Sequence, residues 1–287
     1  MRRDSSSSSG VAARALRILR PVRPDARGFT VMEVLIALCI FLIVLFAVYS
    51  SFESSRATYA AGEQRADIQQ SARIAMELVS ADLRLAGFGY PVGAGNAITA
   101  ATPTSITFWA DLTNASTIVD TNNVNPGNAT ISVTDASGFA AGDTLYIING
   151  GQWDQVIVSA VNTAAIPHTI SISDVGGVQC KDITGVACPL PWSFPWGSQV
   201  SRPRLIQYSW AGDILSKDDD MGDALPLQPL AGNIQNFQMV YFDANNNAPA
   251  ASAGIRRITV TVGVQSPPGW WRQQAFTIVS DIRLRNL

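Results

Sequence analysis

A long apolar run is the strongest hydrophobic pattern in the chain. Residues 29–52 read FTVMEVLIALCIFLIVLFAVYSSF, and Glu33 is the only charged side chain among them. At about 1.5 Å per residue, a helix of this length crosses a bilayer core of roughly 30 Å. The run therefore predicts a transmembrane helix over 29–52. A charge in such a helix costs about 2.5–3.5 kcal/mol on insertion scales, so Glu33 is expected to have a partner or a function.

The helical pattern continues beyond this run and becomes amphipathic. Its apolar positions recur every three or four residues, at Ile68, Ala72, Ala75, Val79, Leu83 and Ala86, with Leu78 and Leu85 expected to widen the stripe. Charged side chains are expected on the other side: Arg65, Asp67, Arg73, Glu77, Asp82 and Arg84. The segment 87–91, GFGYP, ends the pattern because its glycines and proline do not continue a helix. We therefore expect one helix over about 29–85, with an amphipathic part at 53–88 that lies on a β-sheet.

The remaining residues, 89–287, form a β-rich region with few charges. Alternating or β-branched runs predict strands at 105–110, 130–134, 144–149, 155–161, 169–173, 204–210, 234–243, 256–265 and 274–284. No helix alternates with these strands, which favours antiparallel pairing. We interpret 128–174 as an inserted β-subdomain. The predicted fold class is α+β, with a long N-terminal helix packed on an antiparallel β-sheet domain.

The residues before the apolar run are strongly basic. The first 28 residues hold seven arginines and two aspartates. Positive flanks stay in the cytoplasm, so residues beyond the run are expected on the outer side of the membrane. Gly28, a small residue, lies before the run, and cleavage after it would remove the basic leader 1–28 and keep the helix.

Residues 27–37, RGFTVMEVLIA, resemble the class III signal of type IV prepilins and of type II secretion pseudopilins. The resemblance implies that a prepilin peptidase cleaves between Gly28 and Phe29 and methylates the new amino group of Phe29. It also places the acid that is typical of the family at Glu33. Val31 and Met32 replace the more usual Leu-Ile, and the leader is longer than is common in the family.

The chemistry of Glu33 follows from the residues themselves. After cleavage, Phe29 would carry an α-amino group with an ordinary pKa of about 7.7–8.0. Glu33 cannot easily fold back to this amine on its own helix, but it can neutralise the amine of a staggered neighbouring subunit. Because unpaired charges in a dry helical bundle are costly, this pairing would set the register between subunits. The alternative is a single-pass anchor whose Glu33 lies in the headgroup region.

Two further regions resemble PilW-type minor pilins: residues 69–87, with the stretch DLRLAG, and the C-terminal segment 282–286, IRLRN. This resemblance implies a non-enzymatic minor pilin that primes or caps pilus assembly and supports pilus biogenesis, adhesion or twitching motility. The implied partners are the prepilin peptidase, other minor pilins, the major pilin, the inner-membrane assembly platform, inner-membrane lipid and a tip adhesin. The implied location is a single pass in the inner membrane with a periplasmic outer domain, and later the pilus or cell surface. The first alternative is a minor pseudopilin of a type II secretion system; a membrane-anchored periplasmic binding protein or enzyme ranks below it.

The three cysteines bear on the compartment of the outer domain. Cys39 lies within the apolar run and is interpreted as a small apolar filler. Cys180 and Cys188 flank a short loop, and we expect them to form a disulfide in an oxidising compartment. Two free thiols or a metal pair are the alternatives, and zinc is disfavoured because His168 is the only histidine.

Catalytic patterns are nearly absent from the sequence. No Gly-x-Ser-x-Gly elbow, Walker loop or dinucleotide fingerprint occurs, so neither an enzyme activity nor a cofactor is expected, and His168 is interpreted as structural. The acidic turn 218–223, DDDMGD, offers Asp218, Asp220 and Asp223 as weak candidates for calcium, because clustered carboxylates suit a hard cation. We favour a solvated hairpin turn, and no metal is predicted.

Charge and aromatic content bear on the partners. The whole chain has 20 basic and 22 acidic residues, and 13 basic and 20 acidic residues would remain without the leader. A protein that binds nucleic acid usually carries a basic stripe, so no nucleic-acid partner is expected. Two Pro/Trp-rich segments, 189–196 and 267–271, form either caps over the core or an exposed contact patch, and we favour the caps.

Overall fold

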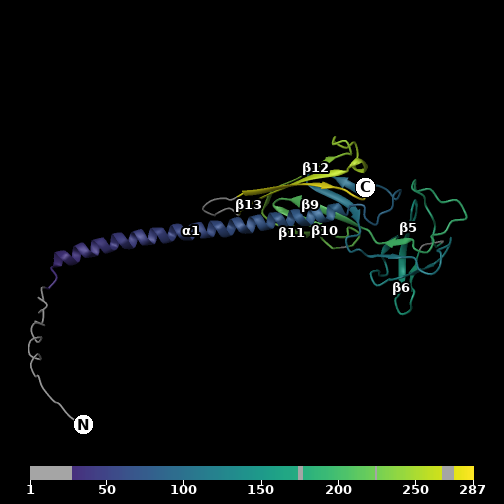
Figure 1. Cartoon of the computed structure of the whole chain (residues 1–287), viewed down its shortest axis with the longest axis horizontal. Helices are drawn as coiled ribbons and strands as arrows, with labels where there is room; N and C mark the ends of the chain where they lie inside the picture. The colour runs from purple at the N-terminus through teal and green to yellow at the C-terminus, as the bar shows by residue number, and fades with distance from the viewer. Residues whose placement is uncertain (1–27, 174–176, 224, 267–274) are drawn as a thin grey trace, which may run out of the picture. The chain divides into compact units, whose positions relative to one another are not determined.

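The computed structural model describes residues 28–173, 177–223, 225–266 and 275–287 (Figure 1). The leader predicted at 1–28 therefore lies outside the described residues, apart from Gly28. One long helix, α1 (Val31–Arg84), opens the fold and confirms the helix predicted over 29–85. The chain divides into two compact units within this helix, Met1–Arg56 and Ala57–Leu287. The second unit contains the carboxyl-terminal part of α1 and all described strands.

Fourteen strands and one short 3-10 helix follow α1 in the described residues, and every strand pairing is antiparallel. The strands are β1 (Ile98–Ala101), β2 (Ser105–Ala110), β3 (Ser116–Ile118), β4 (Thr130–Val133), β5 (Thr144–Asn149), β6 (Gln152–Asn162), β7 (His168–Ile172), β8 (Gln199–Ser201), β9 (Arg204–Ala211), β10 (Ile214–Asp218), β11 (Gln228–Ala231), β12 (Ile234–Phe242), β13 (Arg257–Gln265) and β14 (Ala275–Arg283), with η1 at Ser252–Gly254. The predicted α+β class with antiparallel sheets is thereby confirmed. All nine strands expected from the sequence are present, while β1, β3, β8, β10 and β11 were missed.

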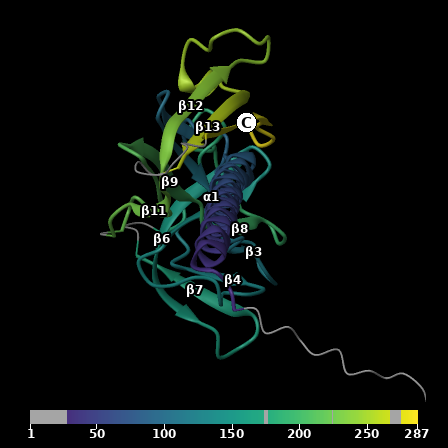
Figure 2. The same ribbon diagram turned by 90° about the vertical axis from the view of Figure 1, so that its left-hand side faces the viewer.

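Two sheets and the carboxyl-terminal part of α1 share one hydrophobic core. The five-stranded sheet has the order β1-β2-β9-β10-β11, and the three-stranded sheet has the order β12-β13-β14. In the view of Figure 2, β9, β12 and β13 lie beside α1. The predicted stripe of α1 is confirmed, because all six of its expected apolar residues are buried. Strand β13 also follows its prediction, with Ile258, Val260 and Val262 fully buried.

The sequence misplaced the borders of this stripe. Leu78 and Leu85, which were expected to widen it, are 36% and 38% exposed. Gln64 and Met76 are buried instead. The sheets therefore cover the edge of the stripe that carries Gln64 and Met76, and leave the edge with Leu78 and Leu85 exposed. Asp82, which was expected on the polar side, is only 8% exposed, because partners on β9 and β10 bind its carboxylate.

A six-stranded sheet forms a second core. Its order is β3-β8-β5-β6-β7-β4, and its buried side chains include Val119, Ile147, Ile170 and Val200. The chain leaves the five-stranded sheet after β2 and returns to it at β9, which pairs directly with β2. Strands β4 to β7 lie within the segment 128–174, and β3 and β8 lie outside it.

Candidate functional site

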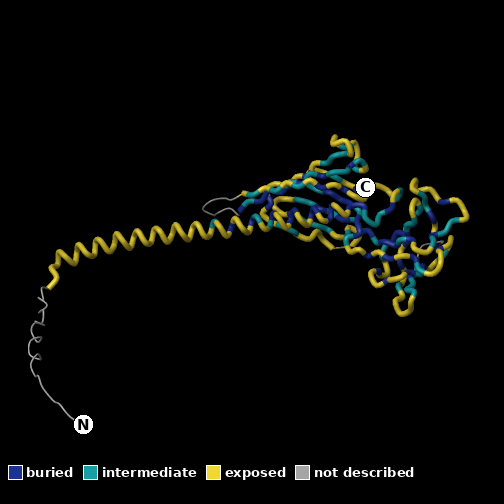
Figure 3. The backbone as a smooth tube through the Cα atoms, in the orientation of Figure 1, coloured by how far each residue is buried: buried dark blue, intermediate teal, exposed yellow. Residues whose placement is uncertain are grey.

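The amino-terminal part of α1 exposes a continuous apolar surface. Figure 3 shows this part in the colour of exposed residues, and Phe29 and Phe46 are 81% and 73% exposed. Within the described residues, α1 is the one helix long and apolar enough to cross a membrane, and none of its most apolar 18-residue stretch is buried. Transfer of so much apolar surface out of water is strongly favourable, so this part of α1 is suited to contact with lipid or with other apolar helices.

The first turn of α1 is capped by Thr30, a residue that the sequence analysis missed. The backbone N–H of Glu33 donates to the Thr30 hydroxyl at 3.2 Å and to the Thr30 carbonyl at 3.0 Å. This is half of a capping box, and the Thr-x-x-Glu spacing in the sequence could have revealed it. The Glu33 carboxylate itself has no hydrogen bond or ion pair with the residues that the structure describes, which leaves it available for a partner outside the chain.

Gly28 is not required by the local structure. A Cβ atom added at Gly28 would meet no atom within 4 Å, and the backbone there is not in the left-handed region. The neighbouring Phe29 is largely exposed. Within the described residues, neither packing nor backbone geometry therefore requires a glycine at this position.

The opposite end of α1 is tied to the sheets by a buried polar network. The Asp82 carboxylate accepts a hydrogen bond from the Tyr208 hydroxyl and lies 2.7 Å from Lys217 Nζ. Lys217 Nζ also lies 2.6 Å from the exposed carboxylate of Asp219. Burial raises the pKa of Tyr208, and the nearby Asp82 charge raises it further. Burial alone would lower the pKa of Lys217, but its bonds to both carboxylates raise that pKa overall.

Cys180 and Cys188 form a disulfide, as expected, with 5.3 Å between their Cα atoms. The enclosed loop is ordered by Asp182, whose carboxylate accepts hydrogen bonds from the Thr184 hydroxyl and from the backbone N–H groups of Thr184 and Val186. These bonds, that from the Thr184 hydroxyl above all, hold the pKa of Asp182 below its ordinary value. The loop is therefore a preformed feature of the outer domain.

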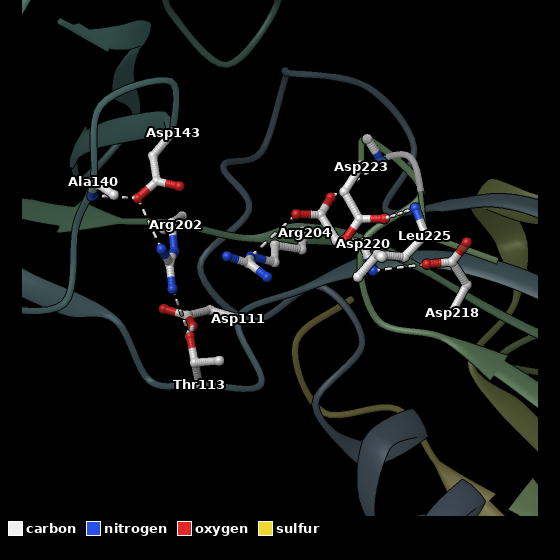
Figure 4. Close-up of polar contacts among 11 residues, drawn as sticks. Asp111, Thr113, Ala140, Asp143, Arg202, Arg204, Asp218, Asp220, Asp223 and Leu225 are labelled. Carbon is white, nitrogen blue, oxygen red and sulfur yellow. Dashed lines mark hydrogen bonds and ion pairs between the residues drawn. The ribbon is translucent and has the colours of Figure 1, made fainter. Parts of the chain in front are cut away.

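The acidic turn uses its carboxylates within the chain (Figure 4). Asp218 accepts the backbone N–H of Asp220, and Asp223 accepts that of Leu225. The Oδ2 atom of Asp220 lies 3.3 Å from Arg204 Nε. No group of three or more potential metal ligands occurs in the described part of the chain. The arrangement is that of a hydrogen-bonded turn.

Figure 4 also shows an ion pair that joins the two cores. Arg202 lies between β8 and β9, and its Nη1 atom is 2.8 Å from a carboxylate oxygen of Asp143, just before β5. The same oxygen accepts the backbone N–H of Ala140 at 2.7 Å. Sequence reasoning did not reveal this pair, because the two residues lie 59 positions apart.

Two remaining candidates are structural. His168 Nδ1 accepts the backbone N–H of Ala136 at 2.9 Å, which joins β7 to the loop after β4. In the segment 189–196, Phe194 is fully buried and Trp192 packs against the second core, so this segment caps the core. Trp196 is 66% exposed. The segment 267–271 lies outside the described residues.

Comparison with known proteins gives a similarity to a pilin-like protein. The chain is 38% identical over 64 residues to the pilin-like protein PilA3 of Thermus thermophilus. The match covers 22% of this chain and 28% of the length of PilA3. No family model and no solved structure matches the chain.

This similarity and the fold agree with each other. The similarity is to a pilin-like protein, and this chain likewise has a long apolar N-terminal helix. The exposed apolar helix fits a single-pass membrane-anchored protein.

Proposed function

We propose that this chain is a minor type IV pilin of the PilW type, cleaved between Gly28 and Phe29 and methylated at Phe29. The observation that carries the proposal is the exposed apolar half of α1 with an uncommitted Glu33 carboxylate in its first turn. A soluble protein would not leave such a surface uncovered. The carboxyl-terminal half of α1 has a complete core of its own, so the exposed half is free to pack elsewhere.

In this proposal, Glu33 pairs with the amino group of Phe29 from a neighbouring subunit. A carboxylate in the first turn also interacts favourably with the helix dipole, worth about 0.3–1 kcal/mol, which is a local explanation for an acid at this position. The pairing with a neighbour adds a second role, because an unpaired charge in a dry bundle of helices would be costly. Assembly, rather than helix stability, is therefore the property that should depend on Glu33.

The outer domain supports a role at the start or tip of the fibre. The outer domain contains a second sheet with its own core, which makes the domain large. A large domain suits a subunit present in few copies better than a subunit that is packed many times along a fibre. The partners would be the prepilin peptidase, other minor pilins, the major pilin, the assembly platform and a tip adhesin. The protein would wait as a single pass in the inner membrane, with its outer domain in the periplasm.

The experiment replaces Glu33 by alanine and compares it with Glu53→Ala. Glu53 is an exposed acid of the same helix that follows the apolar run, so the control removes an equal charge. We expect Glu33→Ala to enter the membrane normally but to be lost from sheared pili, while Glu53→Ala remains. Normal incorporation of Glu33→Ala would refute the assembly role.

Mass spectrometry of the purified protein tests the processing step. The mature chain should begin at a methylated Phe29. A chain that starts at Met1, or that lacks the apolar run, would contradict the proposal.

A minor pseudopilin of a type II secretion system is the second candidate, because it shares the cleavage signal and the helix. Deletion strains separate the two: loss of pili with intact secretion favours the pilin, and the reverse favours the pseudopilin. A membrane-anchored periplasmic protein would show neither defect.

A further inference from the structure

An arginine-rich cleft lies on the outer domain where β14 and α1 end. It has a volume of about 480 Å³ and is lined by Arg84, Asn246, Arg257, Asp281, Arg283 and Arg285. Side chains alternate between the two faces of a strand, and Ile258, Ile282 and Leu284 point into the core. The charged residues between them therefore lie on the outward face of the three-stranded sheet.

The register of this sheet brings like charges together. Arg257 and Arg283 are direct partners across β13 and β14. Like charges in this position destabilise a sheet. Arg285 follows two residues after Arg283 on the same face of the chain, so four arginines face a single aspartate in the cleft. Folding alone gives no reason for this concentration of positive charge.

One of the arginines is already engaged. Arg257 Nη1 lies 3.3 Å from the Asp281 carboxylate, and its guanidinium lies 3.9 Å from the centre of the Phe242 ring. Asp281 also accepts a hydrogen bond from the Thr259 hydroxyl. These contacts neutralise Arg257 and fix it in place.

The other three guanidinium groups have no ion pair or hydrogen bond with the described residues. Arg84 lies in the last turn of α1, where a positive charge interacts favourably with the helix dipole. Arg283 and Arg285 are exposed and have no such structural explanation. They are therefore the residues on which a ligand would depend most.

We propose that this cleft binds an extended acidic segment of a partner subunit, held by Arg283 and Arg285. Guanidinium groups bind carboxylates in a bidentate manner, which makes arginine suited to this role. Alternate residues of an extended chain are spaced about 6.6–6.8 Å apart and point to the same side, so acids at alternate positions of a ligand strand can face two arginines that line one cleft. Strand β14 is an edge strand of its sheet in the described structure, so an extended segment has access. The identity of the partner as a pilus subunit rests on the proposed function; the chemistry of the cleft does not.

The test measures peptide binding to the full chain purified in detergent. The probe is a fluorescent peptide with alternating glutamate and threonine, and the comparison peptide has the same composition with its glutamates adjacent. Binding is followed by fluorescence anisotropy at roughly 50 and 150 mM salt, because screening weakens exposed ion pairs. We expect the alternating peptide to bind more tightly than the comparison peptide.

Matched variants assign the binding to the cleft. R283Q/R285Q should weaken binding at least about tenfold, because it removes two charge-assisted contacts. The control R65Q/R73Q removes the same charge from exposed positions of α1 and should change binding less than about twofold. R283Q also removes the repulsion across the strands, so the double variant should retain the thermal midpoint of the wild type. R285Q alone changes a residue beyond the end of β14 and should also weaken binding. It therefore keeps the test decisive if the double variant does not fold.

Several results would overturn the inference. Equal weakening of binding in both double variants would show a general charge effect. Equal affinity for the two peptides would show that the cleft does not select an extended ligand with alternating acids. Tighter binding of inorganic phosphate or of a short DNA duplex than of the peptide would assign another ligand class. None of these results depends on Glu33, so a failure of the cleft is distinct from a failure of the proposed assembly role.

Discussion

The Asp82 network yields the sharpest test of how α1 is held to the outer domain. Asp82→Ala removes the acceptor of the buried Tyr208 hydroxyl and the more buried of the two carboxylates beside Lys217. The Asp82 and Lys217 side chains are 12% and 13% exposed, whereas Asp219 is 69% exposed. Asp219→Ala is therefore a matched control, since it removes an equal charge from the same lysine at a solvated position.

The expected magnitudes follow from these exposures. A buried hydroxyl left without a partner costs about 1–3 kcal/mol. Breaking a buried ion pair costs about 3–5 kcal/mol, but Lys217 keeps the Asp219 carboxylate, so only part of that penalty applies. We expect Asp82→Ala to lower the free energy of unfolding by about 3 kcal/mol. Exposed pairs contribute about 0–1 kcal/mol, so Asp219→Ala should cost less than about 1 kcal/mol.

Urea unfolding of the full chain in detergent, followed by tryptophan fluorescence, measures both values. A second variant, Asp82→Leu with Lys217→Met, should recover much of the stability, because replacing both charges by apolar groups leaves no buried charge without a partner. The reasoning is refuted if Asp219→Ala is as destabilising as Asp82→Ala, or if the double variant is less stable than Asp82→Ala alone.

The same network gives the pH dependence of stability a definite sign. Tyr208 and Lys217 have pKa values raised above their ordinary values of 10.0 and 10.5, so the folded protein holds these protons more tightly than the unfolded chain. Their contribution to stability is complete below about pH 10 and is lost as the pH rises further. Each proton contributes at most about 1.4 kcal/mol per pH unit. The urea midpoint should therefore decrease as the pH is raised from about 10 to 11, and it should decrease less steeply in Asp82→Ala.

Two further predictions concern the loops of the outer domain. Gly93 and Gly142 have nearly equal backbone angles, φ +95° and +94°, but a Cβ at Gly93 would lie 2.3 Å from a backbone oxygen while one at Gly142 meets nothing within 4 Å. Gly93→Ala should therefore lower the thermal midpoint clearly more than Gly142→Ala, and equal effects would contradict the close approach. Replacing Cys180 and Cys188, eight residues apart, by serine should cost about 2.5 kcal/mol of loop entropy, measured by urea unfolding. Cys39→Ser lies outside this loop, and an equal loss there would count against the prediction.

Local sequence patterns predicted the elements whose burial is regular. The α1 stripe and the alternation of β13 are visible in the sequence because a single face of each is covered by neighbours. Strands β3 and β8 were not predicted, because each has only three residues and is specified by its partner strands rather than by its own sequence pattern. The pairing of β2 with β9 was not predicted either, because the residues that form the second core lie between these strands in the chain.

Charged residues were the least predictable part of the site. Asp82 looks polar in the sequence, and only the folded arrangement of β9 and β10 supplies the partners that allow its burial. The arginine cleft is likewise invisible in the sequence, because it joins residues of α1 and β14 that are about 200 positions apart. Short-range spacing reveals a capping box such as that of Thr30 and Glu33, but it does not reveal long-range charge pairing.

Two of the acids of α1, Asp82 and Glu33, separate stability from assembly. Asp82 is buried and finds both a cation and a hydroxyl donor within its own chain, so its interactions stabilise the fold of the monomer. Glu33 is in a segment whose apolar side chains have no cover in the described structure, and its carboxylate has no partner there. When lipid or other helices cover that segment, the local dielectric falls and the charge becomes costly unless an opposite charge arrives with them. In the proposed assembly, neighbouring helices would supply that charge at one stagger, and Glu33 would then select the register of packing.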